Sequence, residues 1–381
     1  MTAPSPIPFT KPYISGDELS YVAQSFSSPF VTGDGPFTRR ATDLITKITG
    51  GLGSLLTTSC THALEMTALL LDLGPGDEVI MPSFTFVSTA NAYALRGAVP
   101  VFVDISAETL NLDEKLLESA ITERTKAVVV VHYGGVACSM DEITHIAARH
   151  GIAVIEDNAH GLGGSYHGRP LGSLGLMATQ SFHGTKNVHC GEGGALVCND
   201  PDVLARAEIV REKGTNRSQF FRGQVDKYRW VDIGSSYLPA DPLAAFLTAQ
   251  LERFEQIQAP RYASWTAYDE ALAHWAGAHD VRTPVVPEGR QHPAHVYFLV
   301  MPRHDHQVGL IRHLKDLGIT APFHYMPLHS SPAGRKYGRV APGGCAVTDR
   351  ASESLVRLPL FTGLTPTEQA RVVDGVTSYR F

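Results

Sequence analysis

The chain has 381 residues, 43% of them hydrophobic and 18% charged, and its formal net charge is −6 at pH 7. This length exceeds what one hydrophobic core usually supports, so two domains are expected, and the apolar content excludes a disordered chain. An acidic balance without a basic block argues against nucleic acid or an anionic membrane as a partner. No apolar run reaches the length of a membrane span, and Met1–Pro6 lacks the basic and apolar regions of a signal peptide.

The cysteines and histidines do not form a recognisable metal or disulfide pattern. The five cysteines, at positions 60, 138, 190, 198 and 345, include no CxxC pair. Their odd number and spacing suggest neither a zinc site nor a disulfide framework. The seventeen histidines include no HExxH pair, so no metal is predicted. A cytoplasmic protein with reduced thiols is expected.

Helical and strand patterns alternate regularly through the first two thirds of the chain. Helices are predicted from residue 17, in the segment with Arg39 and Arg40, and over 63–73, 88–96, 113–121 and 140–150. Strands are predicted over 78–82, 99–104, 126–133, 152–156, 176–182 and 195–198. This alternation predicts an α/β fold with a mostly parallel sheet covered on both sides, where ligands bind beyond the carboxyl ends of the strands.

The pattern changes near Phe254. Beyond it, helical segments alternate with fewer strands, such as 296–301, which is typical of a smaller α+β domain. The expected division is a large domain over 1–254 and a small C-terminal domain over 255–381.

Lys186 lies in a polar turn between two apolar strand patterns, 176–182 and 195–198, and a glycine-rich segment follows it. One interpretation is a solvated loop cation, since lysine side chains are mostly exposed. The other is an amine held in a cleft by its surroundings.

Asp157 directly follows the strand pattern at 152–156, so it lies where a parallel sheet presents groups to a ligand. It could cap the next turn, or pair with a cationic ring nitrogen as in pyridoxal phosphate enzymes. There the carboxylate keeps the pyridine protonated, and a lysine such as Lys186 supplies the Schiff base. The two residues together indicate this chemistry better than either alone.

Two further segments follow strand patterns. Ser59, Cys60 and Thr61 precede a helix, whose N-terminus with small hydroxyl residues suits a phosphate but is equally an ordinary N-cap. Phe86 could stack on a flat cofactor or lie in the core.

Five motifs in order along the chain resemble those of the DegT/StrS-type sugar aminotransferases, which are fold-type I pyridoxal phosphate enzymes. The motifs are Ser59–Thr61, Phe84–Phe86, Glu156–His160, Ser181–Lys186 and Gly191–Gly194. The resemblance covers essentially the whole chain and is strongest for the branch of the dTDP-4-amino-4,6-dideoxygalactose transaminases (WecE, or RffA). Arg211–Tyr228 and Asp232–Tyr237 look like that branch specifically. It implies an aspartate aminotransferase-like fold and a homodimer.

Carried over residue by residue, the resemblance implies that Lys186 forms the Schiff base with pyridoxal 5′-phosphate and moves protons between substrate and cofactor. Asp157 would pair with the pyridine nitrogen, and Phe86 would stack on the ring. His160 would lie near the phenolic oxygen, where the family often has glutamine. The cofactor phosphate would be held by Cys60, Thr61 and Ser181.

The resemblance also implies substrate contacts and a shared site. Ser236 stands where many members have an asparagine that reaches the phosphate of the neighbouring subunit, and this contact would make a dimer obligatory. The nucleotide diphosphate would be gripped by Asn216, Arg217, Arg222 and Lys227, each of which could also belong to a solvated basic loop. His329 is expected near the sugar.

The implied reaction carries an amino group from L-glutamate, through pyridoxamine phosphate, to the 4-carbon of dTDP-4-keto-6-deoxyglucose. Another nucleotide keto sugar or ring position is the alternative. A dehydratase relative with histidine in place of the lysine is disfavoured by Lys186, and a regulatory homologue by the presence of both Lys186 and Asp157. A nicotinamide oxidoreductase is disfavoured because the glycine fingerprint is missing.

Overall fold

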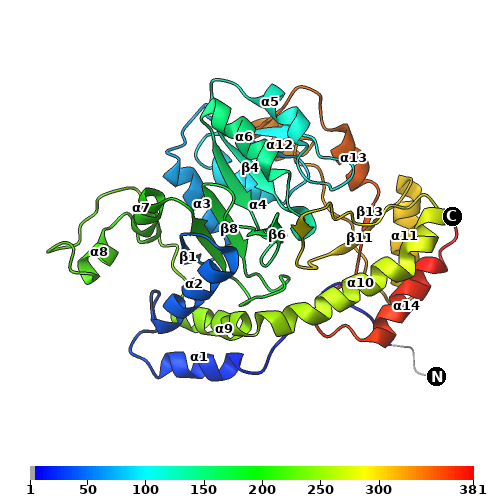
Figure 1. The fold of residues 1–381 in the computed structure, drawn as a ribbon, viewed down its shortest axis with the longest axis horizontal. Helices are drawn as coiled ribbons and strands as arrows, with labels where there is room; N and C mark the ends of the chain where they lie inside the picture. The colour runs from blue at the N-terminus through cyan, green and yellow to red at the C-terminus, as the bar shows by residue number, and fades with distance from the viewer. Residues whose placement is uncertain (1–4) are drawn as a thin grey trace.

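A computed structural model describes residues 5–381, and an eight-stranded sheet forms its centre (Figure 1). The strand order is β1-β9-β8-β5-β4-β2-β3-β12. Strand β9 runs antiparallel to both of its neighbours, and the remaining pairs are parallel. The strands are β1 (Gly53–Thr57), β2 (Glu78–Pro82), β3 (Val99–Val103), β4 (Thr125–Val131), β5 (Ala153–Asp157), β8 (Met177–Ser181), β9 (Gly194–Cys198) and β12 (Arg339–Val340).

The central strands form because their residues are apolar on both faces. Ile80, Val128 and Val130 point into one core, while Val79 and Val129 point into another. Successive side chains of a strand alternate between faces, so a continuous apolar run suits a strand that is covered on both sides. The confirmed architecture is therefore the predicted α/β one, with a central, mostly parallel sheet.

Helices α3, α4 and α7 cover one face of the sheet, while α5, α6, α2 and α9 lie over the other. The helices of this part are α1 (Glu18–Phe26), α2 (Pro36–Thr49), α3 (Cys60–Leu70), α4 (Val87–Ala94), α5 (Leu117–Ala120), α6 (Met140–His150), α7 (Pro201–Arg211), α8 (Arg217–Phe221) and α9 (Asp241–Glu252), with short 3₁₀ turns at Glu114–Leu116 and Tyr133–Gly135. A small sheet pairs β6 (Ser165–Tyr166) with β7 (Arg169–Pro170) and with β10 (Arg290–Gln291).

The C-terminal part builds a second core around a two-stranded sheet. Its elements are α10 (Phe254–Ala278), β11 (Tyr297–Val300), α11 (His304–Asp316), α12 (Pro332–Tyr337), α13 (Ala346–Ser352), β13 (Leu355–Leu358) and α14 (Pro366–Thr377). Ile7, near the N-terminus, also lies in this core and bridges to Ile319. The predicted division at 254 coincides with the start of α10 but assigns Ile7 to the other domain, and it stays a prediction.

One segment stands away from the rest of the molecule. Residues 212–236, which we call the arm, carry α8 and project from the end of α7, as Figure 1 shows at the left. Several large apolar side chains of the arm are exposed, among them Trp230 at 79% and Phe221 at 69%. The arm is tied to α7 by polar contacts, such as the ion pair between Arg206 and Asp232 at 2.8 Å, and it leaves these apolar side chains uncovered.

Several predicted elements are confirmed with the predicted bounds, such as the strand 78–82 and the helix 140–150. The segment 113–121 is instead a 3₁₀ turn followed by one turn of α-helix, because Asp113 caps a 3₁₀ turn through the N–H of Lys115. Strand β1 was not predicted. Within residues 5–381, no helix is long and apolar enough to cross a membrane.

Candidate active site

A cavity of about 800 Å³ opens beside the carboxyl ends of β4, β5 and β8. This is the position at which ligands bind in parallel sheets. Seven of the predicted site residues line it, namely Cys60, Thr61, Phe86, Asp157, His160, Ser181 and Lys186. They come from separate stretches of the chain. The sheet brings them together because the carboxyl ends of its parallel strands lie at the same edge.

Lys186 reaches the cavity from the loop that joins the antiparallel neighbours β8 and β9. Burial lowers the pKa of its amine to about 8, although Cys60 and Asp157 oppose this shift, and Arg357 adds to it. The lowered pKa makes a neutral amine accessible near physiological pH, as base catalysis requires. The loop's rim is formed by His183 and Glu192, whose exposed side chains lie 3.6 Å apart.

Asp157 ends β5 with its carboxylate in the cavity. Its Oδ2 accepts a hydrogen bond from the hydroxyl of Thr89 over 2.7 Å, and Oδ1 accepts one from the N–H of Ala159 over 3.3 Å. Burial raises the pKa of this carboxyl, while the two donors and Lys186 act in the opposite direction. A buried carboxylate held by fixed donors is suited to receive a cationic partner.

The N-terminus of α3 forms one wall of the cavity. The side chain of Ser59 caps the helix by accepting from the N–H of His62, and the Thr61 hydroxyl lies 2.7 Å from the Ser88 hydroxyl. A Cβ atom on Gly194 would lie 2.3 Å from the Cys60 nitrogen, so glycine allows β9 to approach the helix end closely. The N–H groups of a first turn have no partner inside their helix, and they favour an anion such as a phosphate.

Phe86 and His160 complete the predicted set. Phe86 precedes α4 and is 58% exposed, so its ring faces the cavity rather than the core. His160 accepts a hydrogen bond at Nδ1 from the N–H of Gly134 over 3.3 Å, which leaves its proton on Nε2. Burial holds the pKa of this imidazole well below its usual value, so the ring is neutral and can donate from Nε2.

The sequence reasoning missed several residues that line the cavity from the C-terminal part. They are His295, His324, Tyr325 and Arg357, together with Phe9 and Thr10 from the N-terminal segment. Two signals in the sequence point to them. His324 and Tyr325 lie close before the predicted site residue His329, and Arg357 is a lone cation within an apolar strand.

The predicted substrate residues of the arm do not line this cavity. Asn216, Arg217, Arg222 and Lys227 lie on the projecting segment, and Ser236 is exposed at its base, where it bridges to Glu212. Arg217 is paired with Glu212 at 3.0 Å, and Arg222 is paired with Glu208 at 2.6 Å. Within one chain the arm therefore cannot serve the cavity, and its predicted roles depend on a second copy.

His329 also lies outside the cavity lining. Its Nδ1 is 2.8 Å from the Ser83 hydroxyl and its Nε2 is 3.4 Å from Asp349, so it ties the segment after β2 to α13. The predicted contact between His329 and the sugar gains no support from this geometry.

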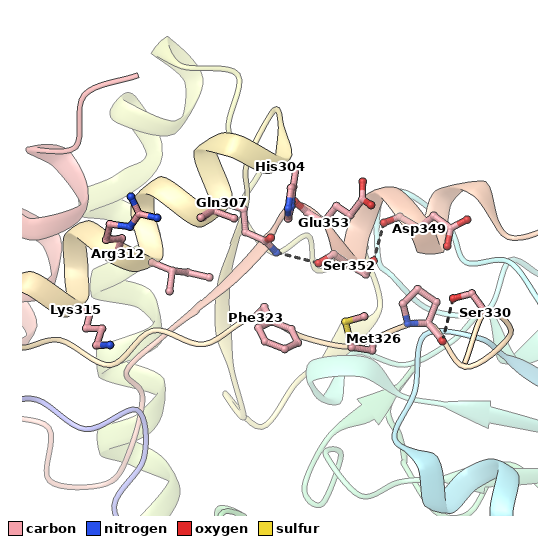
Figure 2. A pocket seen from close by; sticks show the side chains of 13 residues that line it. His304, Gln307, Arg312, Lys315, Phe323, Met326, Ser330, Asp349, Ser352 and Glu353 are labelled. Atoms are coloured by element: carbon pink, nitrogen blue, oxygen red, sulfur yellow. Dashed lines mark hydrogen bonds between the residues drawn. The ribbon is translucent and has the colours of Figure 1, made fainter. Parts of the chain in front are cut away.

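A groove of about 600 Å³ adjoins the cavity, and Figure 2 shows it between α11 and α13. Phe323 and Met326 line both spaces, with exposed fractions of 48% and 68%. Arg312 and Lys315 stand on the α11 side of the groove, opposite Asp349 and Glu353 on the side of α13 (Figure 2). The two spaces are thus separated by one extended segment.

Comparison with known proteins agrees with this geometry. Residues 12–377 match the model of the DegT/DnrJ/EryC1/StrS aminotransferase family. The aminotransferase TlmJ from Streptoalloteichus hindustanus is 30% identical, with 98% of each chain covered and a TM-score of 0.89. A DegT DnrJ EryC1 StrS aminotransferase from Brucella abortus is 29% identical, with 95% of each chain covered and a TM-score of 0.86. Spr1654 from Streptococcus pneumoniae, in its PLP form, is 26% identical, with 98% of each chain covered and a TM-score of 0.89.

The cavity fits pyridoxal 5′-phosphate. The N-terminus of α3 can bind its phosphate, Asp157 provides a buried carboxylate and Lys186 provides a buried amine. A match along nearly the whole chain, together with this arrangement, shows that the protein belongs to the DegT/DnrJ/EryC1/StrS aminotransferase family and uses pyridoxal 5′-phosphate.

Proposed function

We propose that the protein transfers the amino group of L-glutamate to the 4-carbon of dTDP-4-keto-6-deoxy-D-glucose. The products are 2-oxoglutarate and dTDP-4-amino-4,6-dideoxy-D-galactose. The observation that carries the transamination is that Lys186 and Asp157 share one cavity and act on each other's pKa. The choice of acceptor is supported by the likeness of Arg211–Tyr228 to the WecE branch. Such a product suits a cytoplasmic enzyme that supplies precursors of cell-envelope polysaccharides.

Lys186, Asp157 and His160 have separate chemical roles in the proposed reaction. The Lys186 amine acts as a base when it takes a proton from the substrate carbon that carries the amino group. It acts as an acid when it returns a proton to a carbon later in the transfer. Its pKa of about 8 allows both roles near neutral pH. When bound, pyridoxal phosphate supplies a ring that accepts electrons from the deprotonated carbon. Asp157 would pair with the ring nitrogen, and Nε2 of His160 would donate to the phenolic oxygen.

Further contacts orient the cofactor. The phosphate would be held by Cys60 and Thr61 at the first turn of α3 and by Ser181 at the end of β8, and Phe86 would cover one face of the ring. The neutral histidines around the cavity, His295 and His324, add no charge, because burial keeps their pKa values well below the usual range.

We further propose that the arm completes the cavity of a second copy. Its exposed Trp230 and Phe221 offer an apolar surface of the kind that marks an interface between proteins. The guanidinium sides of the pairs made by Arg217 and Arg222 are open to solvent, with exposed fractions of 47% and 46%, so donors remain available to a diphosphate. Asn216 and Lys227 join them at the nucleotide, and Ser236 approaches the neighbour's cofactor phosphate.

An absorbance experiment tests the reaction. The purified holoenzyme is mixed first with L-glutamate and then with dTDP-4-keto-6-deoxyglucose, and the cofactor band is followed. The band is expected to shift with glutamate and to return with the sugar, and Lys186→Ala is expected to show neither change. If the cofactor band shifts with glutamate but does not return when this sugar is added, the acceptor is another keto sugar.

Mixing two inactive variants tests the shared site. Lys186→Ala lacks the amine, and a triple variant with alanine at 217, 222 and 227 lacks the three arm cations proposed to bind the nucleotide. If each cavity is built from two chains, hybrid dimers contain one intact site and the mixture regains activity. A mixture that stays inactive although hybrids form would exclude the shared arrangement.

A further inference from the structure

The groove between α11 and α13 continues outward from the cavity (Figure 2). Phe323 and Met326 line both spaces, so only the extended segment that carries them lies between the two. The groove holds about 600 Å³, which is within the usual range for a site that binds a small molecule. A substrate made of two parts joined by a linker can therefore occupy both spaces at once.

The apolar lining of the groove is exposed. Phe323 and Met326 come from the extended segment, and Val308, which is 40% exposed, comes from α11. Scattered apolar residues on a surface are ordinary, but these come from two elements and face one hollow. An aromatic ring beside a thioether is a surface on which a flat ring can stack, and nucleobases stack on such surfaces whatever their identity.

Two cations stand on the α11 side of the groove. Arg312 and Lys315 are three residues apart, so they lie on the same face of the helix (Figure 2). Within residues 5–381, no carboxylate lies within ion-pair distance of either group, whereas Arg303 beside the same helix is paired with Asp305 at 2.8 Å. Two adjacent cations with free donors suit the oxygens of a phosphate.

Hydrogen-bond acceptors stand on the opposite side of the groove. Among the described residues, the carboxylate of Glu353 has no ion-pair partner, and that of Asp349 has only Nε2 of His329, at 3.4 Å. These carboxylates repel a phosphate placed against them, but they accept readily from a sugar hydroxyl or from the N–H of a base. The two walls therefore match a molecule with phosphates at one end and hydrogen-bond donors at the other.

We propose that the groove binds the nucleoside end of the acceptor, with the diphosphate beside Arg312 and Lys315. This inference rests on the proposed function, which places the keto sugar in the cavity. The sugar is joined to its nucleoside through the diphosphate, so the nucleoside lies beyond the cavity, and the groove adjoins the cavity with a stacking surface and unpaired cations. L-Glutamate has no comparable part, so the groove serves the acceptor alone.

A nucleotide that lacks the sugar tests the groove directly. dTDP and UDP are titrated into the holoenzyme by calorimetry, and Val308→Trp fills the groove from an exposed position of α11. The Kd for these nucleotides is expected to rise roughly tenfold or more, in line with the loss of base stacking. Leu317→Trp is the matched control, because Leu317 is 44% exposed at the end of the same helix and does not line the groove. Its nucleotide binding is expected to equal that of the wild type.

A double variant tests the cations. Arg312→Ala/Lys315→Ala removes both from exposed positions, and the Kd for dTDP is expected to rise roughly tenfold or more as charge-assisted hydrogen bonds are lost. Arg303→Ala/Lys115→Ala removes the same charge at exposed positions outside the groove and is expected to bind dTDP as the wild type does. If Val308→Trp does not fold, this double variant carries the test.

Rapid mixing then compares the two half-reactions. In Val308→Trp, the keto-sugar concentration that gives half of the maximal rate is expected to rise roughly tenfold, while the maximal rate and the reaction with L-glutamate change less than about threefold. Unchanged nucleotide binding in either variant would overturn the inference. Dissociation of a wild-type dimer by Val308→Trp, measured by analytical ultracentrifugation, would assign the groove to a second copy instead. If the wild-type cofactor responds to neither substrate, the proposed function fails, while the nucleotide titrations still report on the groove.

Discussion

Nδ1 of His295 donates a hydrogen bond over 2.9 Å to the side-chain oxygen of Asn187, the residue directly after Lys186. The amide nitrogen of Asn187 donates to Gln258 over 2.8 Å and to the carbonyl of Pro293 over 2.7 Å. One buried amide thus ties the lysine loop to α10 and to the segment before β11. The position of the catalytic amine is set from the C-terminal part as well as from the sheet.

Asn187→Leu should therefore lower both stability and turnover. It removes three hydrogen bonds and leaves buried partners unpaired, which costs about 2–3 kcal/mol. Turnover is expected to fall at least tenfold as the amine loses its fixed position. Urea unfolding and kcat measure the two effects. Asn199→Leu is the control, because Asn199 also donates to two carbonyls, at 3.0 and 2.8 Å, away from the cavity. Equal effects on kcat in both variants would contradict the positioning role.

Lys186→Met should stabilise the apoprotein while abolishing turnover. The pKa of Lys186 falls from 10.5 to about 8 on folding, so the folded protein binds its proton less tightly than the unfolded chain. Below pH 8 the full cost is present, roughly 3 kcal/mol at most, and it fades as the pH rises toward 10.5. Thermal unfolding of the apoprotein from pH 6 to 10 measures this. Lys47→Met, at an exposed position of α2, should show no such trend. A pH-independent gain would refute the assignment.

The same pKa predicts how the apoprotein takes up its cofactor. A neutral amine is the reactive form, so the rate of pyridoxal phosphate uptake should rise with pH and level off above about 8. Stopped-flow absorbance measures this rate. A rate that climbs steadily to pH 10 would show that Lys186 titrates at its ordinary value.

Thr89→Val should weaken cofactor binding through Asp157. The hydroxyl of Thr89 donates to Oδ2, and its loss removes a donor that favours the charged carboxylate. The Kd for pyridoxal phosphate is expected to rise about tenfold, as for one charge-assisted hydrogen bond. Thr67→Val is the control, because Thr67 is buried and bonded to Leu64 and Tyr93 outside the cavity. Equal Kd values for Thr89→Val and wild type would refute the link.

Glu78→Gln should destabilise the protein at neutral pH but less in acid. Glu78 accepts from Arg339 at 2.6 Å and from Arg124 at 2.8 Å, and these contacts lower its pKa. The stabilisation, about 2 kcal/mol, is present above the ordinary pKa and is lost as the pH falls through the lowered value. Urea unfolding at pH 7 and pH 3 measures the difference. Glu118→Gln, which breaks an exposed pair with Arg149, should change little.

The sequence was informative where local pattern and position in the sheet coincide. Lys186 and Asp157 follow apolar strands, and the ends of neighbouring strands converge at one edge, so their meeting could be anticipated. Arg357 could not be anticipated in the same way, because its place on the wall depends on how β13 packs beside the segment before α12. The arm was recognised by resemblance, yet its projection away from its own cavity depends on tertiary packing that no short-range pattern encodes.

The rim of the lysine loop has a consequence for how this enzyme could diverge. His183 and Glu192 stand at the open ends of the loop with exposed side chains, while β8 and β9 hold the loop at both ends. A substitution at Glu192 can alter the entrance without disturbing this pairing, whereas His183 also accepts the N–H of Thr185 at Nδ1 over 3.3 Å and so fixes the turn before Lys186. Substitutions at the cavity entrance can therefore change which acceptor enters, while the strands that position Lys186 stay the same.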